Sequence, residues 1–203
     1  MMKELFVTEN VHACEITEND NSALQEFFDA NPEYFLAVNG MPPRDDEAWQ
    51  EFNDRPPVGM PYERQIMIGF VDQQNQLVAM ASVLANFIAN GVWHIGLFIV
   101  ATRLHGSSAA ASIYQALEHW MQRDGAQWIR LGVVLGNRRA ERFWQKNGYT
   151  ELRQRMGIQT GNLISTVRVL MKSLCGGSPE SYLLLVERDR PDSPSAASPQ
   201  QVG

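Results

Sequence analysis

A chain of 203 residues, 44% of them hydrophobic, is long enough to bury the core of one domain. Its formal net charge of −6 argues against nucleic acid or an anionic membrane as the main partner, and mildly favours a cationic substrate such as an amine. The longest apolar run, residues 95–101, is too short to span a bilayer, and no signal-peptide pattern begins the chain. The two cysteines do not support a disulfide framework, so we expect the protein to reside in a reducing cytoplasm.

The first forty residues predict a strand followed by two short helices. Residues 11–16 favour a strand. A helix with Leu24 and Phe28 on one apolar face ends before Pro32, and a second helix ends at Gly40. Helical spacing of the apolar residues supports both helices.

Residues 41–61 are rich in proline and surround one short helical pattern at 45–52. Proline stiffens turns and cannot donate a ladder hydrogen bond. This stretch is either a plain surface connection or a loop over a ligand pocket, and the sequence leaves both open.

An antiparallel hairpin follows. Residues 64–71 and 77–88 read as its strands, and Asn90-Gly91 is a turn signal that leads into the next strand.

The stretch from residue 95 to residue 121 combines a buried strand, a turn of small residues and a helix. The strand is Ile95 to Val100, the turn is 105–110, and helical apolar spacing begins at Ala110. Backbone N–H groups at a helix start lack intrahelical partners and carry partial positive charge, and small residues let an anion approach them. The turn therefore predicts a phosphate cradle, although many such turns bind nothing.

A second strand and helix follow at 127–135 and 137–148. Asn137 can cap this helix, Ala140 and Phe143 share one face, and Gly148 ends it.

These two segments resemble motifs of the GNAT superfamily, the GCN5-related N-acetyltransferases. Residues 105–110 are similar to motif A, Gln/Arg-x-x-Gly-x-Gly/Ala, with His105 at the first position, Ser108 at the first glycine and Ala110 at the last. A register that starts at Arg103 is less similar, because Ala111 would then begin the buried helix face, which it fits less well than Ile113 does in the preferred register. Residues 137–149 resemble the family's Asn-x-x-Ala-x-x-Phe-Tyr-x-Lys-x-Gly-Phe segment.

The resemblance implies a mixed α/β fold, with a mostly antiparallel sheet flanked by helices and splayed beside motif A to admit the cofactor. It implies an acetyl-CoA-dependent N-acetyltransferase acting on an amine of a small molecule or peptide. The implied cofactor-binding residues are Phe98, Ile99, Val100, His105, Gly106, Ser107, Ser108, Ala109, Ala110, Asn137, Phe143 and Trp144.

His94 is the implied catalytic base. In histone-type members a glutamate base lies on the same strand at this spacing before motif A, and imidazole titrates near working pH. A satisfied, half-buried histidine is the structural alternative. The family's oxyanion donor is often a backbone N–H where the motif A strand splays, here near Phe98 or Ile99. Trp144 stands where many members have a tyrosine that acts as the general acid, so the sequence does not identify a proton donor. It also offers no metal-ligand spacing.

We expect one domain over residues 1–175, with a core at 64–174 and an acceptor-site wall at 20–64. Strands at 150–156 and 165–172 complete the expected sheet. Residues 176–203 form an extension that we expect to be largely disordered from Asp189. The oligomeric state stays open between monomer and homodimer.

Two alternative functions remain. One is a GNAT-fold module that binds acyl-CoA without transfer. The other is a nucleotide-binding protein, which the absence of a Gly-Lys-Ser/Thr ending and of a Gly-x-Gly-x-x-Gly run disfavours.

Overall fold

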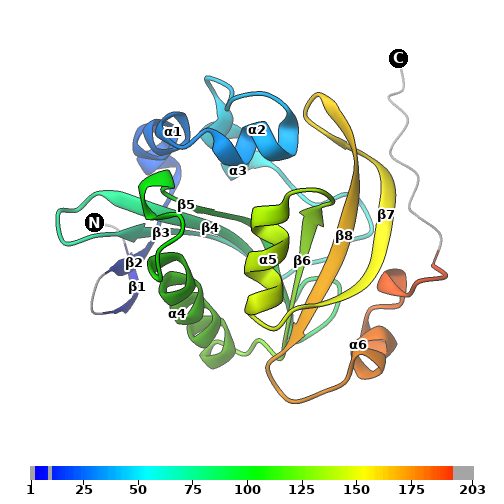
Figure 1. Cartoon of the computed structure of the whole chain (residues 1–203). Helices are drawn as coiled ribbons and strands as arrows, with labels where there is room; N and C mark the ends of the chain where they lie inside the picture. The colour runs from blue at the N-terminus through cyan, green and yellow to red at the C-terminus, as the bar shows by residue number, and fades with distance from the viewer. Residues whose placement is uncertain (1–2, 9–10, 194–203) are drawn as a thin grey trace.

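The computed structural model describes residues 3–8 and 11–193, which form one mixed sheet with helices on both faces (Figure 1). The order of the strands across the sheet is β1-β2-β3-β4-β5-β6-β8-β7. The strands are β1 (Lys3–Val7), β2 (His12–Glu15), β3 (Arg64–Val71), β4 (Leu77–Ala85), β5 (Val92–Val100), β6 (Trp128–Val134), β7 (Thr150–Thr160) and β8 (Leu163–Ser173). Every neighbouring pair is antiparallel except β5 with β6.

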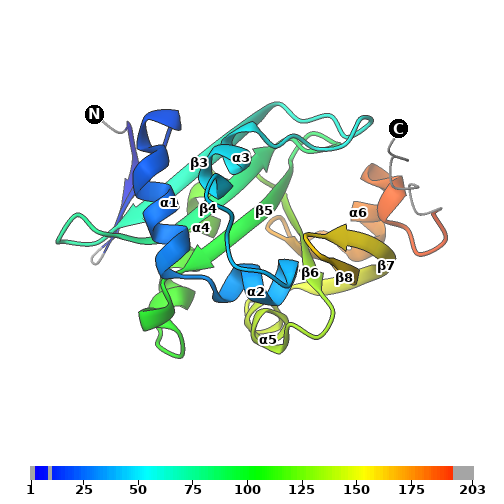
Figure 2. The same cartoon turned by 90° about the horizontal axis from the view of Figure 1, so that it is seen from above.

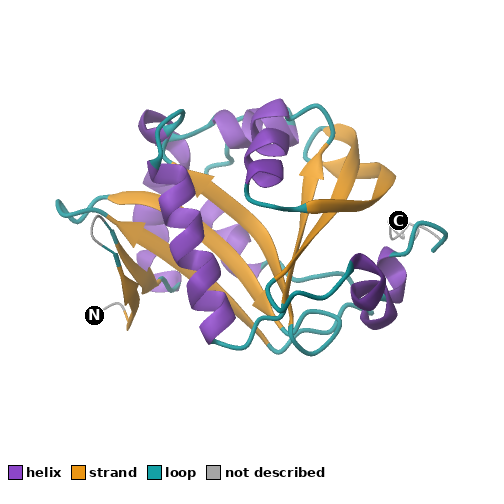
Figure 3. Ribbon diagram, turned by 60° about the horizontal axis from the view of Figure 1, so that its bottom comes forward, coloured by secondary structure: helices purple, strands orange, loops and turns teal. Residues whose placement is uncertain are grey.

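Helices cover the sheet in three groups. The helices are α1 (Asn21–Ala30), α2 (Glu33–Asn39), α3 (Glu47–Asn53), α4 (Ala109–Arg123), α5 (Arg138–Lys146) and α6 (Pro179–Leu185). Helices α1 to α3 lie over one face of β3 to β5 (Figure 2), whereas α4 and α5 lie on the opposite face (Figure 3). Helix α6 packs against Val92, Trp128 and Met171. No helix of residues 3–8 and 11–193 is long and apolar enough to cross a membrane.

Helix α4 follows the spacing read from the sequence. Ile113, Tyr114, Leu117 and Met121 are all buried against the sheet, because residues three and four apart share one face. Each fully buried side chain of this size contributes about 1.5–3 kcal/mol relative to exposure. This packing fixes the helix start, and therefore the turn at 105–108, beside the end of β5.

The sheet opens between β5 and β6. The two strands pair in parallel only from Val92 with Trp128 to Ile95 with Leu131. At the same point β5 bulges, because Val83 of β4 faces Ile95 while Ser82 faces Leu97, which leaves Gly96 unpaired. Beyond Gly96, β5 stays on β4 while β6 continues on β8. The expected splay therefore begins at this bulge.

The structure differs from the expected elements at four places. Strand β1 has no counterpart among the expected elements, and β7 runs to Thr160 rather than residue 156. The strand expected over residues 77–88 ends at Ala85. The C-terminal extension was expected to be disordered from Asp189, yet Asp189 is fully buried in a short 3₁₀ helix (Glu187–Asp189). This part of the prediction was wrong, and the rest of it, residues 194–203, lies outside the described residues.

Candidate active site

One cleft lies where β5, α4 and α5 meet, with a volume of about 790 Å³. The turn before α4 forms one wall, and the N-terminus of α5 forms the other. Gly106 has a φ of +79°, a conformation that glycine adopts without strain. Among the described residues, no group accepts a hydrogen bond from the N–H groups of Gly106, Ala110 or Ala111. These donors line the cleft and are free to bind an anion.

His105 joins the turn to both neighbouring elements. Its Nε2 lies 2.9 Å from the Val100 carbonyl oxygen, and Arg139 Nη1 lies 2.7 Å from its Nδ1. Because an arginine only donates, Nδ1 accepts and Nε2–H donates to the carbonyl. An imidazole can make both hydrogen bonds at once. His105 therefore connects the turn to β5 and to α5 from the position where motif A has Gln or Arg.

Cationic side chains line the α5 side of this cleft. They are Arg138, Arg139, Arg142 and Lys146. Glu33 is the one carboxylate among the described lining residues, and it accepts a hydrogen bond from Thr102, which lowers its pKa. The residues present therefore suit a polyanion such as the phosphates of coenzyme A.

Most of the residues expected to bind the cofactor line this cleft together. They are Phe98, Ile99, Val100, His105, Gly106, Ser107, Ala110, Asn137, Phe143 and Trp144. Ser108 and Ala109 are not among the lining residues, and Ser108 stands at the N-cap position of α4 without a side-chain cap hydrogen bond. Their expected contact with the cofactor stays a prediction.

The free edge of β5 offers two backbone donors toward the splay. Ala101 N–H donates to Val78 on β4 at 2.8 Å. Backbone groups alternate along a strand, so the N–H groups of Phe98 and Val100 face away from β4, whereas that of Ile99 faces it. Of the two residues expected near the oxyanion, Phe98 has the suitable direction.

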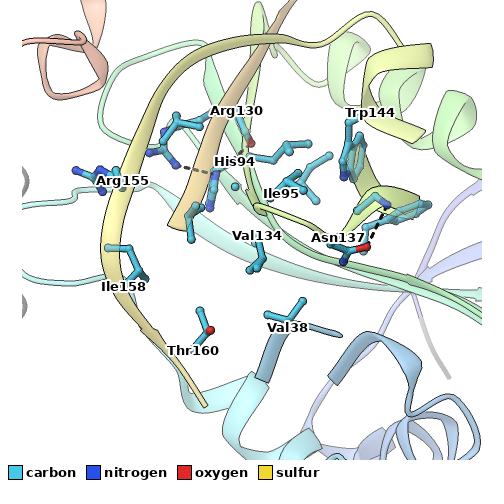
Figure 4. A pocket seen from close by; sticks show the side chains of 18 of the residues that line it. Val38, His94, Ile95, Arg130, Val134, Asn137, Trp144, Arg155, Ile158 and Thr160 are labelled. Atoms are coloured by element: carbon cyan, nitrogen blue, oxygen red, sulfur yellow. Dashed lines mark hydrogen bonds between the residues drawn. The ribbon is translucent and has the colours of Figure 1, made fainter. Parts of the chain in front are cut away.

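A second cavity, of about 330 Å³, lies on the other side of the splay. Strands β6, β7 and β8 form its floor, and α2 contributes Tyr34 and Val38 (Figure 4). The hairpin between β7 and β8 reaches α2 and closes one end: Asn162 N–H donates to Asn39 O at 3.0 Å. A Cβ at Gly161 would lie 2.7 Å from that same carbonyl oxygen.

The two cavities meet at the splay. Five residues line both of them, namely Tyr34, Phe98, Asn137, Ala140 and Trp144. The hydroxyl of Tyr34 has no hydrogen-bond partner within the described part of the chain, and burial, with Glu51 and Glu47 nearby, raises its pKa. This phenol therefore stays protonated at neutral pH and is free to contact a ligand. The sequence analysis did not single it out.

His94 lies in the wall of the second cavity, half-buried and stacked on Phe87 at 4.8 Å between ring centres. Its Nδ1 is 3.1 Å from the Arg130 carbonyl oxygen and 3.4 Å from Arg130 Nη1 (Figure 4). Burial, followed by the positive charge of Arg130, lowers its pKa to about 3. His94 is therefore a neutral imidazole at physiological pH.

Glu51 is a further titratable group close to this site. It extends from α3 to Ser82, whose carbonyl and hydroxyl lie beneath the bulge at Gly96. Burial raises its pKa to about 7, partly offset by the hydrogen bond with Ser82. No sequence signal marks this residue. The described residues contain no group of three or more acidic, histidine or cysteine side chains that could hold a metal ion.

Comparisons with known proteins agree with this geometry. The family model described as the acetyltransferase (GNAT) family matches residues 21–149. An acetyltransferase from Thermus thermophilus superposes with a TM-score of 0.62 at 16% identity, covering 84% of this chain and 99% of its own.

Two further structures have the same fold. A ribosomal-protein-S5-alanine acetyltransferase from Vibrio fischeri has a TM-score of 0.63 at 14% identity, covering 86% of this chain and 98% of its own. Spermidine N-acetyltransferase from Vibrio cholerae, solved with CoA and spermine, has a TM-score of 0.61 at 14% identity, covering 82% of this chain and 96% of its own. No curated protein sequence matches. The match of the family model over most of the chain, together with the splayed sheet, shows that this protein belongs to the GNAT family of acetyltransferases.

Proposed function

We propose that this protein transfers the acetyl group of acetyl-CoA to a primary amine of a small molecule or peptide. The observation that carries the proposal is the meeting of two cavities at the splay between β5 and β6. One cavity has free N–H donors and cationic side chains for the cofactor, and we assign the other, of about 330 Å³, to the amine and call it the acceptor cavity. Phe98 N–H faces the junction, where a tetrahedral oxyanion needs a donor.

A GNAT-fold module that binds acyl-CoA without transfer is the competing function, because Trp144 replaces the tyrosine of many members. A thermal-shift series with acetyl-CoA, CoA and ATP, followed by an assay of free thiol release with pooled amines, separates the two. The enzyme is stabilised by both CoA species and releases thiol only when an amine is present. Stabilisation without amine-dependent release favours the module, and no stabilisation by CoA rejects both.

Tyr34 is our proposed hydrogen-bond donor to the departing thiolate, since it lies at the junction and its raised pKa keeps the phenol protonated. We expect Tyr34→Phe to lower kcat about tenfold, below the usual range for acid catalysis, because a hydrogen bond stabilises the thiolate without transferring a proton to it. The affinity for CoA stays the same. Steady-state kinetics with a CoA titration measure both quantities, and an unchanged kcat contradicts the assignment.

His94 remains the proposed base, and its lowered pKa makes a specific prediction. A folded-state pKa near 3 keeps the imidazole neutral from pH 5 to 9, so the wild-type rate shows no inflection near pH 6.5 that belongs to His94. We expect His94→Gln to lower kcat/KM about tenfold across this range, because a weak base contributes less than a well-matched one.

The matched control for His94 is Glu51→Gln. If the wild-type profile rises through a pKa near 7, and this rise disappears in Glu51→Gln while His94→Gln retains it, the role of base passes to Glu51.

A further inference from the structure

The acceptor cavity carries an excess of positive charge. Its ionisable lining residues are Tyr34, His94, Arg130 and Arg155, and no carboxylate lines it among residues 3–8 and 11–193. A site that selects a polyamine needs carboxylates to offset the second ammonium group. This cavity therefore has the opposite character from the net charge of the chain.

One of the two arginines is already neutralised. Arg130 Nε and Nη2 donate to the carboxylate of Asp189 at 2.7 and 3.0 Å, and both side chains are buried. Tyr182 donates to the same carboxylate at 2.8 Å. Bidentate geometry and a third hydrogen bond satisfy this pair within the protein.

Arg155 has no such partner. It belongs to β7 and is half-buried, and its side chain makes no ion pair or hydrogen bond with any described side chain or backbone group. Its Nε is shielded from solvent without an acceptor, and the same holds for Arg188. Burial, and then Arg188 and Arg130, lower the pKa of the Arg155 guanidinium.

Four guanidinium groups thus lie close to one another, and Asp189 is the one fully buried carboxylate that the described residues place among them. They belong to Arg130, Arg153, Arg155 and Arg188. Arg153 Nη1 donates to the carbonyl oxygens of Arg188 and Arg190 at 3.0 and 2.8 Å, which neutralises no charge, and Arg153 Nε is buried without an acceptor. Partly buried cations without counterions are unfavourable, so an anion bound beside Arg155 stabilises the cluster.

We propose that the acetyl acceptor is a small amine that also carries an anionic group, a carboxylate or a phosphate, held by Arg155 at the β7 side of the acceptor cavity. The inference rests on the proposed N-acetyltransferase function. A cavity of about 330 Å³ accommodates a small molecule of this kind. The arginines also lower the pKa of an ammonium group bound near them, which favours the neutral amine that attacks the thioester.

The test uses the full-length protein, acetyl-CoA and four acceptor pools. The pools contain amino acids, aminoalkyl phosphates, polyamines with aminoglycosides, and C-terminally amidated peptides. Free thiol release is followed for the wild type, for Arg155→Gln and for Arg123→Gln. Arg123 is an exposed residue of α4 outside both cavities, so its variant removes the same charge away from the site.

We expect the best kcat/KM with one of the two anionic pools, and the pool that is active identifies carboxylate or phosphate. Arg155→Gln raises KM for that acceptor at least tenfold with little change in kcat or in KM for acetyl-CoA, whereas Arg123→Gln behaves like the wild type. If the active acceptor is an amino acid, we expect its methyl ester, which lacks the carboxylate, to be a poorer acceptor for the wild type. The kcat/KM for this ester should not change in Arg155→Gln.

A preference for polyamines or amidated peptides overturns this inference and leaves the proposed function in place. An anionic acceptor whose KM is unchanged in Arg155→Gln also overturns it. Thiol release with none of the pools rejects the proposed function itself.

Discussion

Asp189→Ala lowers the free energy of unfolding by about 3–5 kcal/mol, because it leaves Arg130 buried without its counterion. Arg130 is only 6% exposed and Asp189 is fully buried, so water cannot replace the lost carboxylate at the guanidinium. Tyr182 loses its acceptor in the same variant. Chemical denaturation monitored by tryptophan fluorescence measures the change.

Two further variants make this result specific. Asp192→Ala removes an exposed carboxylate three residues away and leaves the stability within about 0.5 kcal/mol of the wild type. Arg130→Met with Asp189→Leu replaces the ion pair by apolar groups and recovers most of the loss, since the unpaired charge is the source of the penalty. If Asp189→Ala unfolds at the same denaturant concentration as the wild type, the C-terminal segment does not dock against β6 in solution.

Ser107→Asp lowers the affinity for CoA about 100-fold. Ser107 is exposed and lines the cofactor cleft, and its Oγ accepts a hydrogen bond from Ala109 N–H at 3.2 Å. An aspartate keeps that acceptor but adds a negative charge where we place the pyrophosphate. Two unit charges about 5 Å apart near a protein surface repel by about 3 kcal/mol, and 2.7 kcal/mol corresponds to 100-fold.

Ser107→Asn is the matched control, because it has the same shape and the same acceptor without the charge. Calorimetric titration with CoA should give it an affinity within about threefold of the wild type. Equal affinities for the aspartate and asparagine variants would show that the phosphates lie elsewhere, and the cradle assignment would fall.

Local patterns in the sequence were enough to predict the elements around the cleft to which we assign the cofactor. The strand, turn and helix of residues 95–121 are contiguous, so helical spacing and small turn residues were enough to predict α4 and the turn beside it. Asn137 accepts a hydrogen bond from Ala140 N–H at 3.2 Å, which is the cap expected at α5. Here the residues that define the feature are neighbours in the chain.

The cavity to which we assign the acceptor depends on contacts between distant segments. Tyr34 and Arg155 lie on α2 and β7, more than a hundred residues apart, and no local pattern shows that they line one cavity. Composition also misled at the C-terminus. Proline and serine indicated disorder from Asp189, but pairing with Arg130, 59 residues earlier, holds that residue in the core.

Net charge and the lining of the acceptor cavity favour different acceptors. The chain carries a formal charge of −6, whereas the groups that line the acceptor cavity are neutral or positive. Charge summed over a whole chain bears on solubility and long-range attraction, and the local arrangement of side chains decides what a cavity binds.

Incubation with acetyl-CoA labelled with ¹³C in the acetyl group, followed by mass spectrometry of the four amine pools, tests the central claim most directly. The account predicts a labelled N-acetyl product equal in amount to the released thiol, dependent on the protein, and strongly reduced by Ser107→Asp at subsaturating acetyl-CoA. A protein that binds CoA tightly yet leaves every amine unlabelled would contradict it, and would identify the chain as an acyl-CoA-binding member of the family.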